Sequence, residues 1–289
     1  MNPDPDTLRL ALPKGRMLDG LLTLLRDAGM HVDVGARGYR PRFSLPQSDV
    51  KLLKPQNIVE MLHAGTRDVG FTGADWVAEL DGQLVELLDT GLDPVRVVAA
   101  APAALLVDGK LPKRRLVVAS EFERLTRAWI DAQGIDATFV RSYGATEVFP
   151  PEDADLIVDL VATGSTLRAN QLLEVGEVMP SSTRLYASRR ACDDPKKRAR
   201  IDDLVMLLRS VLDARLRVMV ELNVGKDRLE EVCKALPCMR EPTVAQLAHD
   251  AGFAVRAAVP RKDLPTLIPR LRACGGSDIV VTACAQIVP

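Results

Sequence analysis

Short apolar runs alternate along this chain with segments whose apolar residues recur every three to four positions. The runs LRLAL, VGF, RLVVA and LIVDLV are each too short for a buried helix, and each precedes an amphipathic segment. The amphipathic segments are MLDGLLTLLRDAG (17–29), WVAEL (76–80), FERLTRAWIDAQG (122–134) and LRANQLLEVG (167–176). This alternation is typical of strand–helix units on a largely parallel sheet. We therefore expect an α/β protein.

Two longer extended passages, residues 92–102 and 184–194, separate groups of these units. Two such crossovers fit a first lobe that is discontinuous in sequence and wraps around an inserted second lobe, with a ligand cleft between them. The first lobe is placed at residues 1–98, continued by 182–212, and the second at residues 99–181.

The character of the chain changes near residue 213. Residues 213–289 give the order strand, helix, strand, strand, helix, strand, which is the order of a ferredoxin-like module. The chain is thus expected to carry a C-terminal ferredoxin-like α+β domain after its two α/β lobes.

Composition excludes several classes of protein. Charge is nearly balanced, with 38 basic and 39 acidic residues, so no overall field favours nucleic acid or a membrane surface. The five cysteines form no CxxC pair, which argues against a disulfide scaffold or a zinc site and gives them no assigned role. The first residues lack the pattern of a signal peptide, and no apolar run is long enough to span a bilayer. We expect a cytoplasmic protein.

The segment DLIVDLVATGST (155–166) carries the clearest chemical signal. A strand that ends in TGST and leads into a helix presents free backbone amides and three hydroxyls to an anion, here at Thr163, Gly164, Ser165 and Thr166. Asp155 and Asp159 are four residues apart on the strand and so point to the same face. A phosphorylated sugar would use both the cradle and the acids. The alternative is that TGST only caps a helix and that the acids cap neighbouring loops.

Two further clusters follow strands. In ALPKGR, Lys14 and Arg16 come directly after the first strand, where ligands bind in open α/β sheets, and both can pair with phosphates. In DVGFTGADWVAEL, Asp75 opens a helix after a second strand. The alternatives are a simple basic loop and an acid that only complements the helix dipole. Neither a GxxxxGK[ST] loop nor a GxGxxG motif is present.

The three clusters together, ALPKGRM, DVGFTGADWVAEL and DLIVDLVATGSTLRANQL, resemble the ATP phosphoribosyltransferase family, and the resemblance covers essentially the whole chain. It implies two lobes of the periplasmic-binding-protein type and an ACT-like regulatory domain. It also implies a reaction in which N1 of ATP displaces pyrophosphate from C1 of phosphoribosyl pyrophosphate, with Mg²⁺ required. The resemblance further implies that the chain forms homodimers or homohexamers and that histidine acts as a feedback inhibitor.

The resemblance also implies roles for particular residues. Thr163, Gly164, Ser165 and Thr166 would hold the 5-phosphate, and Asp159 with Asp155 would bind the ribose hydroxyls. Lys14, Arg16 and Asp75 would serve ATP or pyrophosphate. Glu147 matches a glutamate of the family motif and would act as a base or as partner of the adenine amine, although the spacing here is one residue shorter. No metal ligand is assigned, because the substrate would hold most of the Mg²⁺.

Two more positions are considered on the same basis. Lys54 stands where many members have an arginine, and it is given no role. Thr243 in EPTV is a candidate contact for histidine, and the alternative is that it caps a following helix, VAQLAHDAG.

Two other functions are open from the residues alone. A non-catalytic two-lobed binding protein would use the same architecture, because fold does not fix function. A phosphoribosyltransferase for another base is closer, but such enzymes usually place two adjacent acids before the turn, whereas Leu160 follows Asp159 here.

Overall fold

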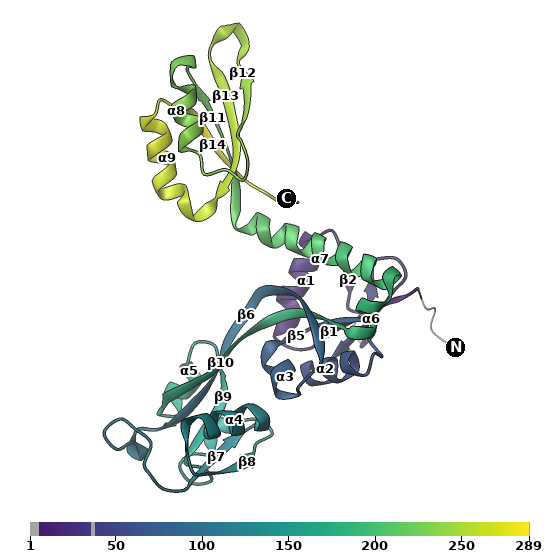
Figure 1. Ribbon diagram of the computed structural model, residues 1–289, viewed down its shortest axis with the longest axis vertical. Coiled ribbons are helices and arrows are strands. Elements are labelled where there is room, and N and C mark those ends of the chain that lie inside the picture. The colour runs from purple at the N-terminus through teal and green to yellow at the C-terminus, as the bar shows by residue number, and fades with distance from the viewer. Residues whose placement is uncertain (1–5, 36–37, 289) are drawn as a thin grey trace. The chain divides into compact units, whose positions relative to one another are not determined.

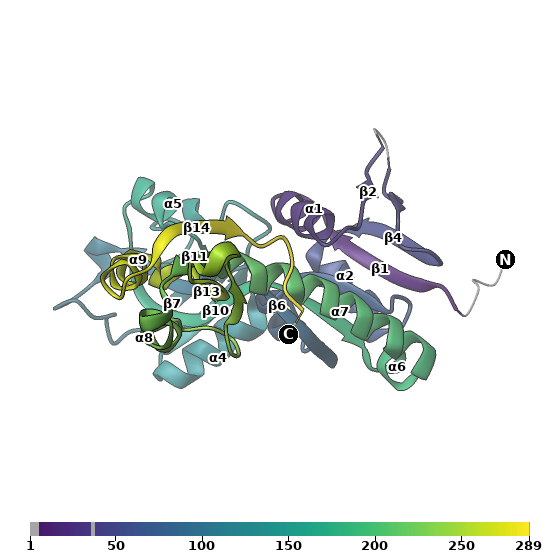
Figure 2. The same cartoon turned by 90° about the horizontal axis from the view of Figure 1, so that it is seen from above.

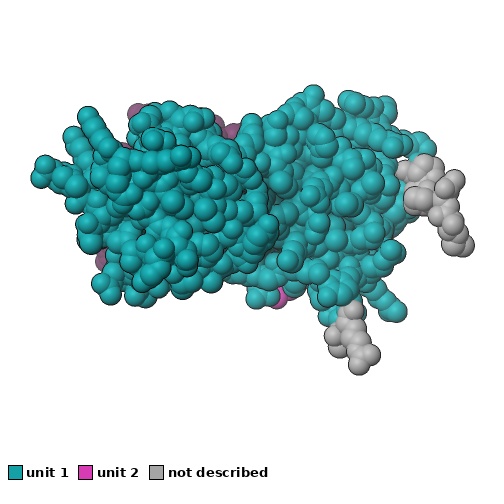
Figure 3. Space-filling view, turned by 90° about the horizontal axis from the view of Figure 1, so that it is seen from below, with its two compact units in different colours: residues 1–23, 30–202 teal, residues 24–29, 203–289 magenta. Residues whose placement is uncertain are grey.

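A computed structural model describes residues 6–35 and 38–288 of the chain. They divide into two compact units, coloured separately in Figure 3. The first takes in the residues up to 23 and 30–202, and the second takes in 24–29 and 203–289. None of the helices in the described residues has the length and apolar character that crossing a bilayer requires.

The first unit is built on one eight-stranded sheet, visible in Figure 1. Its strands follow the order β4-β1-β5-β10-β6-β9-β7-β8. Their bounds are β1 Leu8–Pro13, β4 Ser48–Leu53, β5 Val69–Gly73, β6 Leu84–Pro102, β7 Leu116–Ser120, β8 Ala137–Arg141, β9 Leu156–Val161 and β10 Leu172–Ser188. A short separate hairpin joins β2 (Val32–Asp33) to β3 (Arg42–Phe43). The sheet confirms the α/β prediction.

The sheet has two parallel halves, which we call the first and second lobes. In the first lobe β4, β1 and β5 are parallel. The helix α1 (Met17–Asp27) follows β1, α2 (Pro55–His63) follows β4, and α3 (Ala74–Glu79) follows β5. In the second lobe β9, β7 and β8 are parallel, with α4 (Glu123–Gln133) and α5 (Ser165–Ala169).

Two long antiparallel strands, β6 and β10, join the lobes. β10 pairs with β5 of the first lobe through residues 183–187, and β6 pairs with β9 of the second lobe through residues 96–100. These strands contain the extended passages expected at 92–102 and 184–194, although β10 ends at Ser188 and the short helix α6 (Arg189–Asp193) begins there. The stretch from Val97 to Ala101 is fully buried, so the connection lies inside the core.

The helix expected over residues 167–176 is wrong. The helix α5 is only five residues long, Gln171 has a φ of 56°, and β10 begins at Leu172. Leu172 is buried and pairs with Pro102 of β6, so sheet pairing outweighs the helical spacing of the apolar residues here.

The second unit contains the C-terminal module. After α7 (Pro195–Arg215) come β11 (Arg217–Val224), α8 (Leu229–Ala235), β12 (Thr243–Gln246), β13 (Phe253–Pro260), α9 (Leu264–Ala273) and β14 (Ser277–Ala283). The sheet order β12-β13-β11-β14 is antiparallel throughout and is the ferredoxin-like arrangement. Alternate residues of β11 are buried beneath the two helices. Thr243 opens a strand, so the helix considered after it is wrong.

Candidate functional site

The turn after β9 is shaped by a left-handed glycine. Gly164 has a φ of 71°, a conformation that side chains rarely adopt, and it is the N-cap of α5 without a side-chain cap bond. The Ser165 N–H donates a long hydrogen bond of 3.5 Å to the Thr163 hydroxyl, and the next amides of α5 have no partner within the helix and remain available to a ligand. The hydroxyls of Thr163 and Ser165 are 3.0 Å apart and exposed. The turn therefore presents amides and hydroxyls together.

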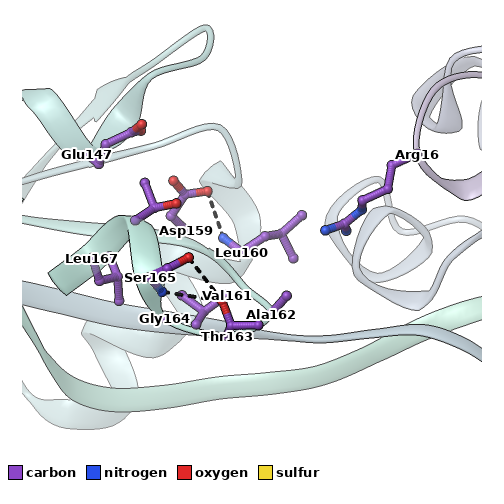
Figure 4. A pocket seen from close by; sticks show the side chains of 11 residues that line it. Arg16, Glu147, Asp159, Leu160, Val161, Ala162, Thr163, Gly164, Ser165 and Leu167 are labelled. Carbon is purple, nitrogen blue, oxygen red and sulfur yellow. Dashed lines mark hydrogen bonds between the residues drawn. The ribbon is translucent and has the colours of Figure 1, made fainter. Parts of the chain in front are cut away.

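A pocket of about 490 Å³ lies over this turn, and both lobes contribute to it. Residues 159–167 form most of its wall, Glu147 stands opposite, and Arg16 reaches in from the first lobe, as Figure 4 shows. The pocket thus combines hydrogen-bond donors at the turn, carboxylates on one side and a guanidinium on the other. This combination suits a phosphorylated polyol.

Asp159 is the carboxylate closest to the turn in sequence, and its environment disfavours the charged form. Burial raises its pKa to about 6. The backbone N–H of Leu160, which donates to Asp159 Oδ1 at 2.7 Å, opposes the shift, and the carboxylates of Glu147 and Glu121 add to it. Asp159 is therefore poised to change charge just below neutral pH.

Glu147 reaches the pocket from a compact loop after β8. It lies in a single 3-10 turn, Thr146–Val148, which begins at Ala145 with a φ of 49°. The buried hydroxyls of Ser142 and Thr146 are hydrogen-bonded at 2.7 Å and fix the loop. The structure thus brings Glu147, Asp159, Arg16 and the turn together in one pocket.

Asp155 does not join this pocket. It precedes β9, whereas Asp159 is near the other end of the strand, about 13 Å further along at the usual rise per residue. Asp155 accepts hydrogen bonds from the Val117 N–H and the Arg114 guanidinium, both at 2.7 Å, and these bonds lower its pKa. The two acids therefore lie at opposite ends of β9.

Asp75 is also outside the lining of the pocket. Asp75 is 3% exposed, and its carboxylate accepts a 2.5 Å hydrogen bond from the Ser181 hydroxyl of β10. Burial raises its pKa, and the charge of Arg16 lowers it in part. Asp75 therefore faces the interior near Arg16 rather than open solvent.

Lys14 lies in a second, basic pocket of about 370 Å³ in the first lobe. Its ammonium group stands 3.8 Å above the ring of Tyr39, and Arg40 and Lys51 complete the cationic lining. The charge of Arg67, with burial and the charge of Arg40, lowers the pKa of Lys51. The sequence analysis missed Tyr39, Arg40 and Lys51, because contacts between separate segments bring them to Lys14. Lys51 lies on β4, which pairs with β1 (Figure 2), and the Tyr39 carbonyl accepts a hydrogen bond from the Leu52 N–H of β4.

Two other sequence positions have distinct surroundings. Lys54 is exposed at the N-cap of α2 and makes no side-chain cap bond. Thr243 lines a pocket of about 420 Å³ in the C-terminal module, with Arg240, Glu241 and Arg256. Arg256 is ion-paired with Glu221 on the same sheet.

The fold and the pocket define a two-lobed α/β protein with a polar site suited to a phosphorylated ligand. A family model described as "ATP phosphoribosyltransferase" matches residues 54–210, and one described as "HisG, C-terminal domain" matches residues 214–286. The chain belongs to the ATP phosphoribosyltransferase family.

Relatives and a solved structure agree with this assignment. The ATP phosphoribosyltransferase of Chlorobium luteolum is 36% identical over 94% of each chain, and that of Pelotomaculum thermopropionicum is 33% identical over 98% of this chain and 99% of its own. A structure of the ATP phosphoribosyl transferase (HisG:HisZ) complex from Thermotoga maritima matches with a TM-score of 0.64 and 24% identity. It covers 72% of this chain and 99% of that one, and it supports the fold.

Proposed function

We propose that the protein catalyses attack of N1 of ATP on C1 of 5-phosphoribosyl 1-pyrophosphate, giving N1-(5-phosphoribosyl)-ATP and pyrophosphate, the first step of L-histidine biosynthesis. The observation that carries the proposal is the pocket in which Asp159, Glu147 and Arg16 surround the turn Thr163–Thr166. Family membership over nearly the whole chain supports the same reaction.

The residues have distinct parts in this reaction. The amides and hydroxyls of Thr163 to Thr166 hold the 5-phosphate, and Asp159 binds the ribose hydroxyls. Displacement at an anomeric carbon develops positive charge on the sugar, which the Asp159 carboxylate stabilises. Arg16 meets the phosphates from the first lobe, and Asp155 keeps its contacts at the far end of β9.

ATP and the leaving pyrophosphate are assigned to the cationic side of the site. Lys14 and Arg40 offer positive charge, and Tyr39 offers an aromatic face. Asp75 is buried and interacts electrostatically with Arg16. Glu147 is proposed as the base or the partner of the adenine amine, because it stands across the pocket from the turn.

Mg²⁺ is proposed as the divalent cation of the reaction. In the described residues no group of three or more His, Cys, Asp or Glu side chains could hold a metal ion by itself. Mg²⁺ keeps waters and substrate oxygens among its ligands, and Asp159 and Glu147, which line the pocket, would be its protein carboxylates. When bound, the cation would neutralise charge on the leaving pyrophosphate.

The test is to mix the protein with ATP, phosphoribosyl pyrophosphate and Mg²⁺ and to follow pyrophosphate release. Release that requires all three components supports the proposal. A protein that binds the sugar phosphate without releasing pyrophosphate would be a binding protein. Replacing ATP by other purines or pyrimidines in the same assay distinguishes a phosphoribosyltransferase for another base.

Histidine is proposed as a feedback inhibitor that binds the C-terminal module, in a cytoplasmic homodimer or homohexamer. The pocket beside Thr243 supports this, because Arg240 suits a free carboxylate and Glu241 suits an ammonium group. Replacing Thr243 by Val is expected to weaken histidine binding about threefold to tenfold, the cost of one hydrogen bond. Calorimetry of the intact protein with histidine measures this, and the absence of binding heat in the unaltered protein would refute the proposal. Mass measurement by light scattering tests the oligomer.

A further inference from the structure

The ends of α3 and α4 are capped across the two lobes. The N-cap of α4 is Phe122, whose side chain offers no acceptor to the free amides of the first turn. Glu79, the last residue of α3, supplies that acceptor from the first lobe. Its two carboxylate oxygens accept hydrogen bonds from the backbone N–H groups of Arg124 (3.1 Å) and Leu125 (3.0 Å). The Glu79 side chain is buried, so no water replaces these bonds.

The second lobe returns the contact. The Arg124 guanidinium donates to the carbonyl of Ala78 at 2.6 Å and to the Asp81 carboxylate at 3.2 Å, which satisfies the end of α3. The rings of Trp76 and Phe122 lie 4.7 Å apart beside these bonds. We call this set of contacts the α3–α4 latch. Each helix end is completed by the other lobe.

The latch adds to the connection that β6 and β10 make between the lobes, and this connection contains shifts in register. The register of this pair shifts between Glu174 and Gly176, between Glu177 and Met179, and between Ser181 and Thr183. Bulged ribbons bend and twist locally, so two such strands alone leave the angle between the lobes weakly determined. A third contact between the lobes fixes it.

Both lobes contribute residues to the pocket, so the distance between the lobes determines whether those residues can contact one ligand. Arg16 belongs to the first lobe, and the turn Thr163–Thr166 belongs to the second. The helix α3 begins at Ala74, next to the buried Asp75, and ends at Glu79 in the latch. Burial raises the pKa of Asp75, and the nearby charge of Arg16 opposes part of this rise. One short helix thus connects the latch to the surroundings of Arg16.

We infer that Glu79 and Arg124 are positioning residues that hold the lobes at the separation at which Arg16 and the phosphate turn act on one ligand. The inference deepens the proposed function and rests on it only for the identity of that ligand.

The spectroscopic test uses Trp76, which lies in the latch. The chain has two tryptophans, and replacing Trp129 by Phe leaves Trp76 as the single reporter. In this background Glu79→Ala and Arg124→Ala are expected to shift the Trp76 emission to the red and to increase its quenching by acrylamide. The matched control is Arg127→Ala, which breaks the exposed ion pair with Glu123 on the same helix and should leave Trp76 unchanged. Unchanged quenching in both latch variants would overturn the inference.

The kinetic test separates positioning from general stability. Glu79→Ala should lower kcat/KM for phosphoribosyl pyrophosphate about tenfold, chiefly through KM, as expected when a charged acceptor of buried amides is removed. Glu79→Gln retains one acceptor oxygen and should lose less. Arg124 is exposed, so Arg124→Ala keeps the test valid if Glu79→Ala does not fold.

A double variant gives the decisive result. If the latch acts through Arg16, the combined loss in Glu79→Ala with Arg16→Ala is smaller than the product of the single losses. A fully multiplicative loss would overturn the positioning role. If the unaltered protein releases no pyrophosphate, the proposed function fails, while the Trp76 measurements still decide whether the latch holds the lobes.

Discussion

The two lobes have the same strand–helix construction but bring opposite chemistry to the site. At the strand ends of the first lobe stand the cations Lys14 and Arg16, with Arg40 and Lys51 beside them. The second lobe contributes Asp159, Glu147 and the hydroxyl-rich turn. In the proposed reaction the sugar and its 5-phosphate are bound by the second lobe, and the charge of ATP and pyrophosphate is met by the first. A reaction between two phosphorylated substrates needs both, so substitutions in the two lobes should fail in different ways.

The largest effect is expected on the acidic side. Asp159→Asn should lower kcat by on the order of 10² or more, because it removes a negative charge that stabilises the cation-like sugar. KM for the sugar should change less than kcat. The measurement is steady-state pyrophosphate release. Full activity in this variant would remove Asp159 from the proposed chemistry.

The same substitution should stabilise the fold at neutral pH. The folded-state pKa of Asp159 is raised from 3.8 to about 6, so its stability contribution is largest below pH 3.8 and is lost as the pH rises through 6. Removing the charge should therefore raise the free energy of unfolding at pH 7.5 by on the order of 1–3 kcal/mol. Urea unfolding of both proteins at pH 7.5 and pH 4 tests this, and an equal difference at both pH values would contradict it.

A smaller effect is expected on the cationic side. Arg16→Ala should lower kcat/KM by about tenfold to fiftyfold, because one charge-assisted contact to a phosphate is lost. The loss should appear mainly in KM, in contrast to Asp159→Asn. Arg26→Ala, which removes an exposed charge from the last turn of α1, is the control. An equal loss in the control would show that only overall charge matters.

The smallest effect concerns pH. If the ionised Asp159 is required, kcat/KM should fall as the pH drops below about 6, since this ratio reports the free enzyme. The Glu147 carboxylate contributes to the raised pKa of Asp159, so Glu147→Gln should move this limb to lower pH. If the acidic limb of the pH profile does not move, the charge of Glu147 does not influence the ionisation of Asp159.

The strand–helix units were predictable because their apolar runs are short, buried and followed by amphipathic helices. The TGST turn was predictable because glycine and hydroxyls have local geometric meaning. The helix at 167–176 was not, because the choice between helix and strand at Leu172 is made by pairing with Pro102, 70 residues earlier. Periodicity within a segment contains no information about that partner.

Contacts between distant segments were not predictable from local patterns. The spacing of Asp155 and Asp159 did not show that the Arg114 guanidinium and the Val117 N–H hydrogen-bond to Asp155. Lys51 reaches the basic pocket, and Glu79 the α3–α4 latch, through contacts between distant segments. The local pattern around Glu79 indicates only an amphipathic helix. The roles of Lys51 and Glu79 can be recognised only when the order of the strands in the sheet is known.

The register of β6 against β10 places the two points at which the chain enters and leaves the second lobe next to each other. The chain leaves the first lobe near Arg96 and returns near Pro180, and these two residues face each other across the ladder. A chimera could therefore exchange the intervening segment for that of a relative with two neighbouring splice points, transferring the acidic half of the chemistry while the cationic half stays in place.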